Sequence, residues 1–238
     1  MKKICIIIPC YKVKNKILQV INNIDLKLVN QILVIDDKCP ENTGRYIQKK
    51  KKKKVKVIYK AKNSGVGGAT ITGFNYAIKK NFDIAIKLDG DGQHNPKDLK
   101  KFISSFASSK TNFVKGTRFN ELINIKKIPL FRLIGNIILT FLTQINCRNF
   151  KISDALNGYL AISINLLKKL NLKEISNDFF FEEDLLFRIS FLNEKISEIP
   201  IKTIYAGGSN LIPINVVFPF ILKHIKNFLI RCKYDLFG

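Results

Sequence analysis

The fold is decided by Ile84-Ala85-Ile86-Lys87-Leu88-Asp89-Gly90-Asp91-Gly92-Gln93-His94-Asn95-Pro96. The apolar run at its start is typical of a buried strand, and the run ends in two carboxylates, Asp89 and Asp91, flanked by glycines that let a ligand approach the backbone. Such oxygen ligands suit Mg²⁺ or Mn²⁺, which shares its coordination with substrate phosphates. Spacing alone also allows a solvated turn. Asn95 and Pro96 favour the start of a helix.

Strands and helices alternate on both sides of this stretch. We expect strands at 3–9, 31–36, 55–59, 84–88 and 112–116, with helices ending near 23 and spanning 43–50, 68–80 and 96–108. This order predicts βαβ units around a mostly parallel sheet, in which ligands bind beyond the carboxyl ends of the strands. Three of these ends carry candidate binding residues, namely Pro9 and Tyr11, Asp36 and Asp37, and Asp89 and Asp91.

A glycine-rich segment, 63–69, separates the third strand from its helix. Its glycines fit a phosphate cradle at a helix N-terminus, although the spacing matches neither the dinucleotide fingerprint nor a P-loop. A tight turn that packs the helix against the sheet is the alternative.

Two apolar segments dominate the second half, 128–146 and 219–234. Each fits an ordinary core-facing helix or an interfacial helix lying on an anionic membrane. We expect no membrane-spanning helix, because polar residues or prolines interrupt both of the longest apolar candidates. Arg132, Asn136 and Gln144 interrupt 128–145, and Pro213, Asn215 and Pro219 interrupt 211–222. The first strand is too short to be the core of a cleavable signal.

The 238-residue chain carries a net charge of +23, with 46% hydrophobic residues. It is long enough for one sizeable core, and two independent domains are not expected. The charge favours an anionic partner, either nucleic acid, a membrane or a substrate, or it reflects a general use of lysine. The lysine run at 49–54 is typical of a solvated loop. The five scattered cysteines predict reduced thiols in a cytosolic setting.

Taken together, the motifs resemble family-2 glycosyltransferases, specifically the branch of dolichyl- and polyprenyl-phosphate sugar transferases. The resemblance covers nearly the whole chain. Its motifs lie at 8–11, 35–44, 63–70, 89–96, 115–119, 153–159 and 180–188. It implies the GT-A fold, an α/β architecture with a Rossmann-like, mostly parallel sheet flanked by helices, and amphipathic C-terminal helices. Residues 1–120 are expected to bind nucleotide-sugar and metal, and residues 121–238 the acceptor, within one continuous domain.

The resemblance also implies roles for individual residues. Those matching donor-binding positions are Pro9, Tyr11, Asp36, Asp37, Asn63, Gly67 and Asp89, with Asp36 less certain than Asp37. Asp89, Asp91 and Gln93 match the ligands of Mg²⁺ or Mn²⁺, which assists departure of the nucleoside diphosphate. Arg118 and Arg132 match basic residues that face phosphates, which arginine can grip with two hydrogen bonds.

The nature of the acceptor decides how the carboxylates of the later motifs act. Asp154, Glu182 and Asp184 match acidic family positions, and any of them is a candidate base for a hydroxyl acceptor. A lipid phosphate is already largely anionic at neutral pH, so it needs positioning rather than deprotonation. We expect Glu183 on an exposed helix face and an ion pair between Asp184 and Arg188. His94 and His224 have no matched catalytic role and are expected at the surface or on a helix.

These observations predict an inverting, metal-dependent glycosyltransferase. It would move a hexose, from a donor of the GDP-mannose or UDP-glucose type, to a polyprenyl or dolichyl phosphate at the cytoplasmic membrane face, bound peripherally or through a membrane-protein partner. The alternative enzyme uses a saccharide hydroxyl in surface-polysaccharide synthesis. A basic nucleic-acid-binding protein is the alternative of another class, disfavoured because the converging motif residues are acidic and would repel a phosphate backbone.

Overall fold

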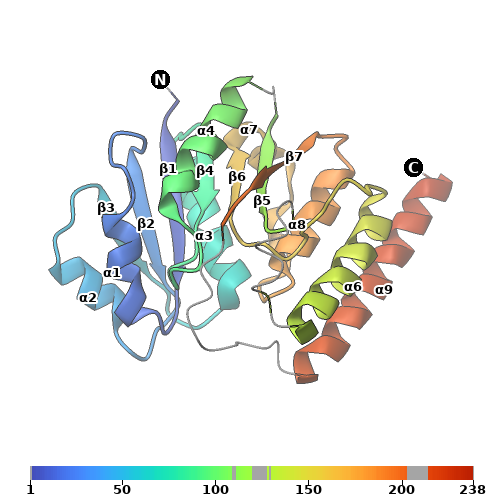
Figure 1. Ribbon diagram of the computed structural model, residues 1–238, viewed down its shortest axis with the longest axis horizontal. Coiled ribbons are helices and arrows are strands. Elements are labelled where there is room, and N and C mark those ends of the chain that lie inside the picture. Colours follow the sequence, from blue (N-terminus) through green and yellow to red (C-terminus); the bar gives the residue numbers. More distant parts are fainter. Residues whose placement is uncertain (1, 109–110, 120–127, 129, 203–213, 238) are drawn as a thin grey trace.

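A seven-stranded sheet forms the centre of the protein, seen in a computed structural model that describes residues 2–108, 111–119, 128, 130–202 and 214–237. The strand order is β3-β2-β1-β4-β6-β5-β7 (Figure 1). The strands are β1 (Ile4–Cys10), β2 (Gln31–Asp36), β3 (Val55–Tyr59), β4 (Ile84–Lys87), β5 (Phe113–Thr117), β6 (Leu160–Ser163) and β7 (Ile196–Pro200). Only the pairings of β6 with β4 and β5 are antiparallel, which confirms the mostly parallel sheet.

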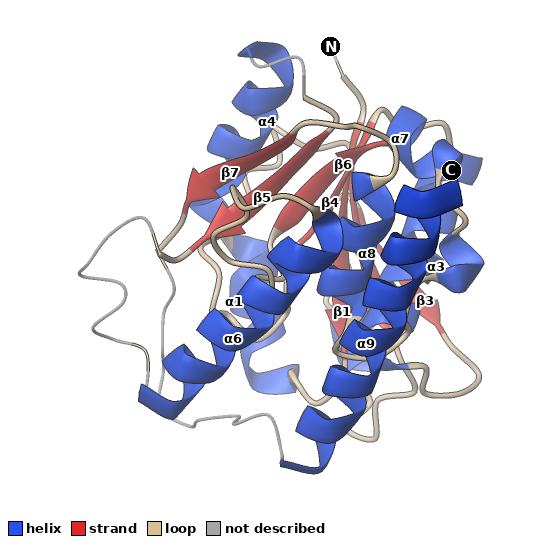
Figure 2. Cartoon of the chain, turned by 90° about the vertical axis from the view of Figure 1, so that its right-hand side faces the viewer, coloured by secondary structure: helices blue, strands red, loops and turns tan. Residues whose placement is uncertain are grey.

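Helices cover both faces of the sheet. One face carries α1 (Lys14–Asn22), α2 (Thr43–Lys49) and α4 (Leu99–Ser108), the last preceded by the 3₁₀ turn η1 (Pro96–Asp98). The other face carries α3 (Gly65–Lys79), α7 (Ile164–Lys169) and α8 (Phe181–Ser190), with a second 3₁₀ turn, η2 (Leu172–Glu174). The remaining helices, α6 (Leu130–Cys147) and α9 (Ile214–Phe237), lie side by side at the end of the molecule away from β3 (Figures 1 and 2).

The sheet lies between two hydrophobic cores. Alternate residues of β1 contribute to each, with Cys5 and Ile7 facing the α3 side and Ile4, Ile6 and Ile8 facing the α1 side. Because both faces of the central strands are covered, their sequences are continuous apolar runs rather than alternating patterns. The carboxyl ends of β1, β2 and β4 are neighbours, so the three strand ends predicted to carry binding residues do come together.

Several predicted elements agree with the structure. β2 and β3 have the expected bounds, and Asn95 caps η1 by accepting a hydrogen bond from the Lys97 backbone nitrogen at 3.1 Å. α3 begins at Gly65 rather than at residue 68. Neither β6 nor β7 was expected, since each is short, with four and five residues.

The apolar segments of the second half form α6 and α9, with Pro219 inside α9. Among the described residues, α6 is long and apolar enough to cross a membrane by length and composition, although 33% of it is buried within the protein. Arg132 lies inside this 18-residue window, and the expectation that no helix spans a membrane stays a prediction. All five cysteines are free thiols, and Cys5 lies in a core strand as expected.

Candidate active site

A buried lysine organises the carboxyl end of β4. The Nζ atom of Lys87 lies 2.5 Å from Asp89 Oδ1 and 3.0 Å from Glu182 Oε1, and it donates a hydrogen bond to the Gly158 carbonyl at 3.2 Å. The Lys87 side chain is 1% exposed, whereas that of Asp89 is 28% exposed. β4, α8 and the loop before β6 therefore meet at one ammonium group. Sequence analysis assigned Lys87 no role, although a lysine ending a buried apolar strand was a signal.

The two aspartates of this strand end differ in their electrostatics. Desolvation alone would raise the pKa of Asp89, but the Lys87 ammonium outweighs it and holds that pKa below its usual range. The pKa of Asp91 is raised, by burial and then by the negative charge of Asp89. Asp91 Oδ1 accepts a hydrogen bond from the Gln93 backbone nitrogen at 2.9 Å. Asp91 is thus a carboxylate whose ionised form a nearby cation would stabilise.

His94 lies beside Asp89 rather than at the surface. It is 6% exposed, its Nδ1 atom is 3.6 Å from Asp89 Oδ2, and its ring contacts Tyr159 with centroids 5.4 Å apart. Burial lowers the pKa of His94 to about 4, so the ring is neutral at physiological pH. The expectation of a surface or helix position for His94 was wrong, because the segment after Asp91 places the ring against Asp89 and Tyr159.

The neighbouring strand end, that of β2, carries Asp36 and Asp37. Both oxygens of Asp36 accept backbone hydrogen bonds, from Cys39 at 2.8 Å and from Gly44 at 2.7 Å, so Asp36 shapes the turn into α2. Asp37 accepts hydrogen bonds from the backbone nitrogen and hydroxyl of Ser64, at 2.9 and 2.8 Å. Asp37 therefore joins the end of β2 to the glycine-rich segment.

The other candidate donor-binding residues border the same edge. Pro9 is buried in β1, level with Ile35 of β2, and Tyr11 is 44% exposed just beyond the strand. Asn63 accepts a hydrogen bond from the Gly65 backbone nitrogen at 3.1 Å. A Cβ atom on Gly67 would lie 2.8 Å from Cβ of Phe181, so the glycine permits close packing of α3 against the start of α8. This contact supports the packing interpretation of the glycine-rich segment.

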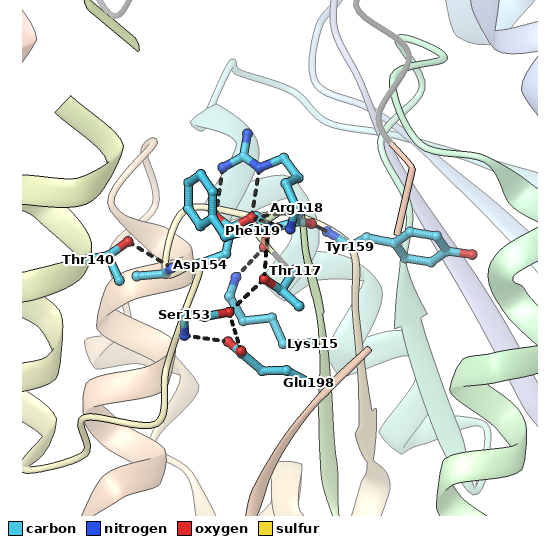
Figure 3. A network of polar contacts seen from close by, with 11 residues as sticks. Lys115, Thr117, Arg118, Phe119, Thr140, Ser153, Asp154, Tyr159 and Glu198 are labelled. Carbon is cyan, nitrogen blue, oxygen red and sulfur yellow. Dashed lines mark hydrogen bonds and ion pairs between the residues drawn. The ribbon is translucent and has the colours of Figure 1, made fainter. Parts of the chain in front are cut away.

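Arg118 and Asp154 form a buried ion pair beyond the end of β5 (Figure 3). The Nε and Nη2 atoms of Arg118 each lie 2.7 Å from a carboxylate oxygen, and the Arg118 backbone nitrogen donates a third bond at 3.0 Å. Asp154 is fully buried; burial would raise its pKa, but Arg118 holds it below the usual range. The Nε and Nη2 atoms of Arg118, which could otherwise bind a phosphate with two hydrogen bonds, are therefore occupied by Asp154.

The loop that carries Asp154 is bound along its length (Figure 3). Ser153 contacts Glu198 of β7 and Thr117 of β5, with the two hydroxyls 2.6 Å apart. Lys115, a fully buried lysine of β5, donates to the Asn157 carbonyl. Lys115 and Lys87 thus hold consecutive carbonyls of this loop. Sequence analysis identified none of Lys115, Ser153 and Glu198 as site residues.

The remaining acidic candidates lie on α8 and separate into three environments. Glu182 contacts Lys87, as described above. Asp184 accepts a hydrogen bond from the Ser176 backbone nitrogen at 2.8 Å and lies 3.6 Å from Arg188 Nε, which confirms the predicted ion pair. Glu183 is 1% exposed, so the expectation of an exposed helix face was wrong.

Glu183 belongs to a polar cluster where α6, α8 and α9 meet. Its Oε1 atom lies 3.1 Å from Nε2 of His224 and 3.3 Å from the Thr143 hydroxyl. His224 is 4% exposed, which places it on a helix as expected but not at the surface. Burial raises the pKa of Glu183, and the His224 contact partly opposes this shift. Arg132 lies apart from this cluster, in the first turn of α6, and is partly exposed.

Comparison with known proteins agrees with this architecture. The sequence model described as "Glycosyl transferase family 2" matches residues 5–170. The UDP-N-acetylglucosamine–dolichyl-phosphate N-acetylglucosaminyltransferase of Methanococcus voltae is 32% identical over 235 residues, covering 92% of each chain. The polyprenol monophosphomannose synthase of Mycolicibacterium smegmatis is 24% identical over 205 residues, covering 82% of this chain and 75% of the relative.

Solved structures share the fold. Glucosyl-3-phosphoglycerate synthase from Mycobacterium tuberculosis, crystallised with Mn²⁺, UDP and phosphoglyceric acid, superposes with a TM-score of 0.71 at 15% identity. The alignment covers 97% of this chain and 78% of that structure. The expected GT-A fold is thereby confirmed. With the carboxylates at its strand ends and a family match over most of its length, the chain belongs to glycosyl transferase family 2 and is a glycosyltransferase.

Proposed function

We propose that this glycosyltransferase transfers a sugar from a nucleotide-sugar to a polyprenyl or dolichyl phosphate. One observation carries the choice of acceptor: all three candidate bases are already engaged. Asp154 is held by Arg118, Glu182 by Lys87, and Asp184 by the Ser176 backbone nitrogen. A hydroxyl acceptor needs a carboxylate that can take its proton, whereas a phosphate acceptor does not. The names of the Methanococcus and Mycolicibacterium relatives, with their dolichyl phosphate and polyprenol, support the same choice.

A divalent cation fits the end of β4. Asp89 and Asp91 offer the oxygen ligands that Mg²⁺ and Mn²⁺ prefer, and Gln93 is a further candidate ligand. The raised pKa of Asp91 supports this assignment, because the Asp89 charge beside it is only partly compensated. When bound, the metal supplies Lewis-acid assistance to departure of the nucleoside diphosphate. The structures of the glucosyl-3-phosphoglycerate synthase with Mn²⁺ or Mg²⁺ and UDP support a metal in this fold.

The chain's own residues would then bind and orient the two substrates. Tyr11 and the end of β2 would border the nucleotide-sugar donor. Arg118 is already held by Asp154, so its positive charge could face the reacting phosphate with little further loss of side-chain entropy on binding. Arg132, on α6, would contact the lipid phosphate from the other half of the molecule.

A membrane-docking surface fits a lipid acceptor. Large apolar side chains are exposed along α6 and α9, a surface called here the α6–α9 face: Leu130, Phe131, Ile134, Ile137, Ile138, Phe141, Phe218, Ile221, Leu222, Ile225, Phe228 and Leu229. A groove of about 270 Å³ runs between the two packed helices, and its lining includes Leu142, Ile225 and Phe228. Exposed apolar area together with a net charge of +23 supports peripheral binding to an anionic membrane, at its cytoplasmic face.

The test is a release assay with purified protein, Mn²⁺ or Mg²⁺, and a short polyprenyl phosphate. The donor panel contains UDP-glucose, UDP-N-acetylglucosamine and GDP-mannose, and freed nucleoside diphosphate is measured with Asp91→Ala as the control. Release that requires the lipid phosphate, the metal and Asp91 is the expected result. Stabilisation by a nucleotide-sugar without lipid-dependent release would favour the saccharide acceptor. Binding of nucleic acid without any nucleotide-sugar binding would overturn the proposal.

A further inference from the structure

Lys87 is a charged side chain placed inside the sheet. It lies on β4, level with Ile7 of β1 and Leu160 of β6, and is fully buried. Burying an ammonium group is costly unless each of its donors finds a partner. Lys87 has three donors and three acceptors, on Asp89, Glu182 and Gly158. Two carboxylates and a carbonyl around one Nζ atom match the three N–H donors of an ammonium group, so the side chain is cationic.

The space around this ammonium group is closely fitted. A Cβ atom on Gly158 would lie 2.6 Å from Lys87 Nζ and 2.5 Å from Asp89 Oδ2. Any larger residue at 158 would therefore push the lysine away from its carboxylates. A carboxylate from α8 and one from the end of β4 are thus held together by one buried ammonium group.

The charges at this strand end come close to balance when a divalent cation is added. With their carboxylates ionised, as metal ligation requires, Asp89, Asp91 and Glu182 contribute three negative charges and Lys87 one positive charge, which leaves two negative charges. The adjacent Arg118–Asp154 pair is neutral. Without Lys87 the excess would be three negative charges, which attracts a metal ion more strongly but repels the diphosphate of a donor.

We propose that Lys87 is a positioning residue that orients Asp89 and Glu182 and sets the charge of the site so that both a divalent metal and a diphosphate can bind. This inference rests on the proposed function, because it assumes that Asp89 is a metal ligand. Lys87 itself touches neither metal nor sugar in this role. Its contribution is to hold two carboxylates close together without excess negative charge.

The experiment compares Lys87→Met with Lys115→Met. Both lysines are fully buried and bond to consecutive carbonyls, of Gly158 and Asn157, but Lys115 forms no salt bridge with Asp89 or Glu182 among the described contacts. At pH 8, binding of Mn²⁺ alone is followed by electron paramagnetic resonance, donor KM by the release assay, and folding by thermal melting. The double variant Lys87→Met/Glu182→Gln returns the net charge of the site to minus two.

Lys87→Met is expected to bind Mn²⁺ alone several-fold more tightly while its donor KM rises about tenfold, because the charge change acts in opposite directions on cation and diphosphate. The double variant should recover most of the donor KM. The inference is overturned if Lys87→Met weakens the binding of both Mn²⁺ and the donor, which is the result expected of general damage to the site and is checked with Lys115→Met. It is also overturned if Lys87→Met changes the binding of neither. If Lys87→Met does not fold, a folded double variant with near-normal donor KM supports the inference, and an unfolded one overturns it. Failure of the wild-type protein to bind Mn²⁺ or a donor would instead contradict the proposed function.

Discussion

Arg118 and Asp154 are bound through both carboxylate oxygens, with the Nε and Nη2 atoms of Arg118 each 2.7 Å from an oxygen. The pair joins the end of β5 to the loop before β6, and neither side chain is more than 7% exposed. In the proposed reaction this pair fixes the position of a positive charge. Removing one partner would leave the other charge buried and unpaired.

Asp154→Asn is therefore expected to lower the free energy of unfolding by about 3 kcal/mol and to raise the KM for the lipid phosphate. Urea unfolding and the release assay measure the two effects. The control is Asp235→Asn, which removes the exposed pair with Arg148 at 3.0 Å and should have little effect, because exposed ion pairs contribute little. Equal stability of the Asp154 and Asp235 variants would contradict a structural role for the buried pair.

Asp184→Asn should be tolerated in catalysis. The side chain anchors the Ser176 backbone nitrogen, so we expect the free energy of unfolding to fall by about 1–2 kcal/mol while kcat changes less than about threefold. Loss of a general base would instead lower kcat by about 10²- to 10⁴-fold. A drop of that size in kcat, with donor binding intact, would favour a hydroxyl acceptor.

Lys115 is expected to make the free energy of unfolding depend on pH in the alkaline range. Burial lowers the pKa of Lys115 from 10.5 to about 8, so between these values the unfolded chain binds a proton that the folded protein has lost. The free energy of unfolding therefore rises with pH across this window, by no more than about 3 kcal/mol from this group. Urea unfolding from pH 7.5 to 10.5, with Lys115→Met as the reference, measures the difference. A difference that stays constant with pH would show that the amine keeps its proton.

Chelation of divalent metal with EDTA should abolish sugar transfer, and added Mn²⁺ should restore it, since Asp89 and Asp91 would hold the cation. We expect the melting temperature of the donor-free protein to fall on chelation, because a cation bound to the folded chain stabilises it and Lys87 alone leaves two negative charges at the site. Activity that survives chelation would remove the metal from the proposed function. An unchanged melting temperature would mean that the cation binds only together with the donor.

The α6–α9 face should direct membrane binding. Replacing Phe131, which is 83% exposed, and Phe141, which is 53% exposed, by serine should reduce flotation with vesicles containing anionic lipid, because apolar area is lost from the binding surface. Tyr59→Ser is the control, since this side chain is 45% exposed on β3, at the opposite end of the sheet (Figure 1). Equal flotation of all the variants would assign membrane binding, if any, to charge alone.

The sequence by itself determined the order of strands and helices in the first half, and with it the edge of the sheet where β2 and β4 lead to Asp37 and Asp89. These features depend on local apolar runs, turn residues and the carboxyl-end rule for parallel sheets, all of which can be read from neighbours in the chain. Seven motifs in order along the chain, of which 89–96 is one, also sufficed to predict the family. The functional division between residues 1–120 and 121–238 stays a prediction.

Only the tertiary structure decided which charges pair. Lys87 with Glu182, Arg118 with Asp154, and Glu183 with His224 each join segments distant in the sequence, and their burial depends on how β6, α6 and α9 pack. Periodicity cannot reveal such pairs, because a charged residue in a buried position is tolerated only when long-range packing supplies its partner. For the same reason His94 and Glu183 were assigned to the surface. Whether a carboxylate is available as a base or is already bound is a property of the folded chain.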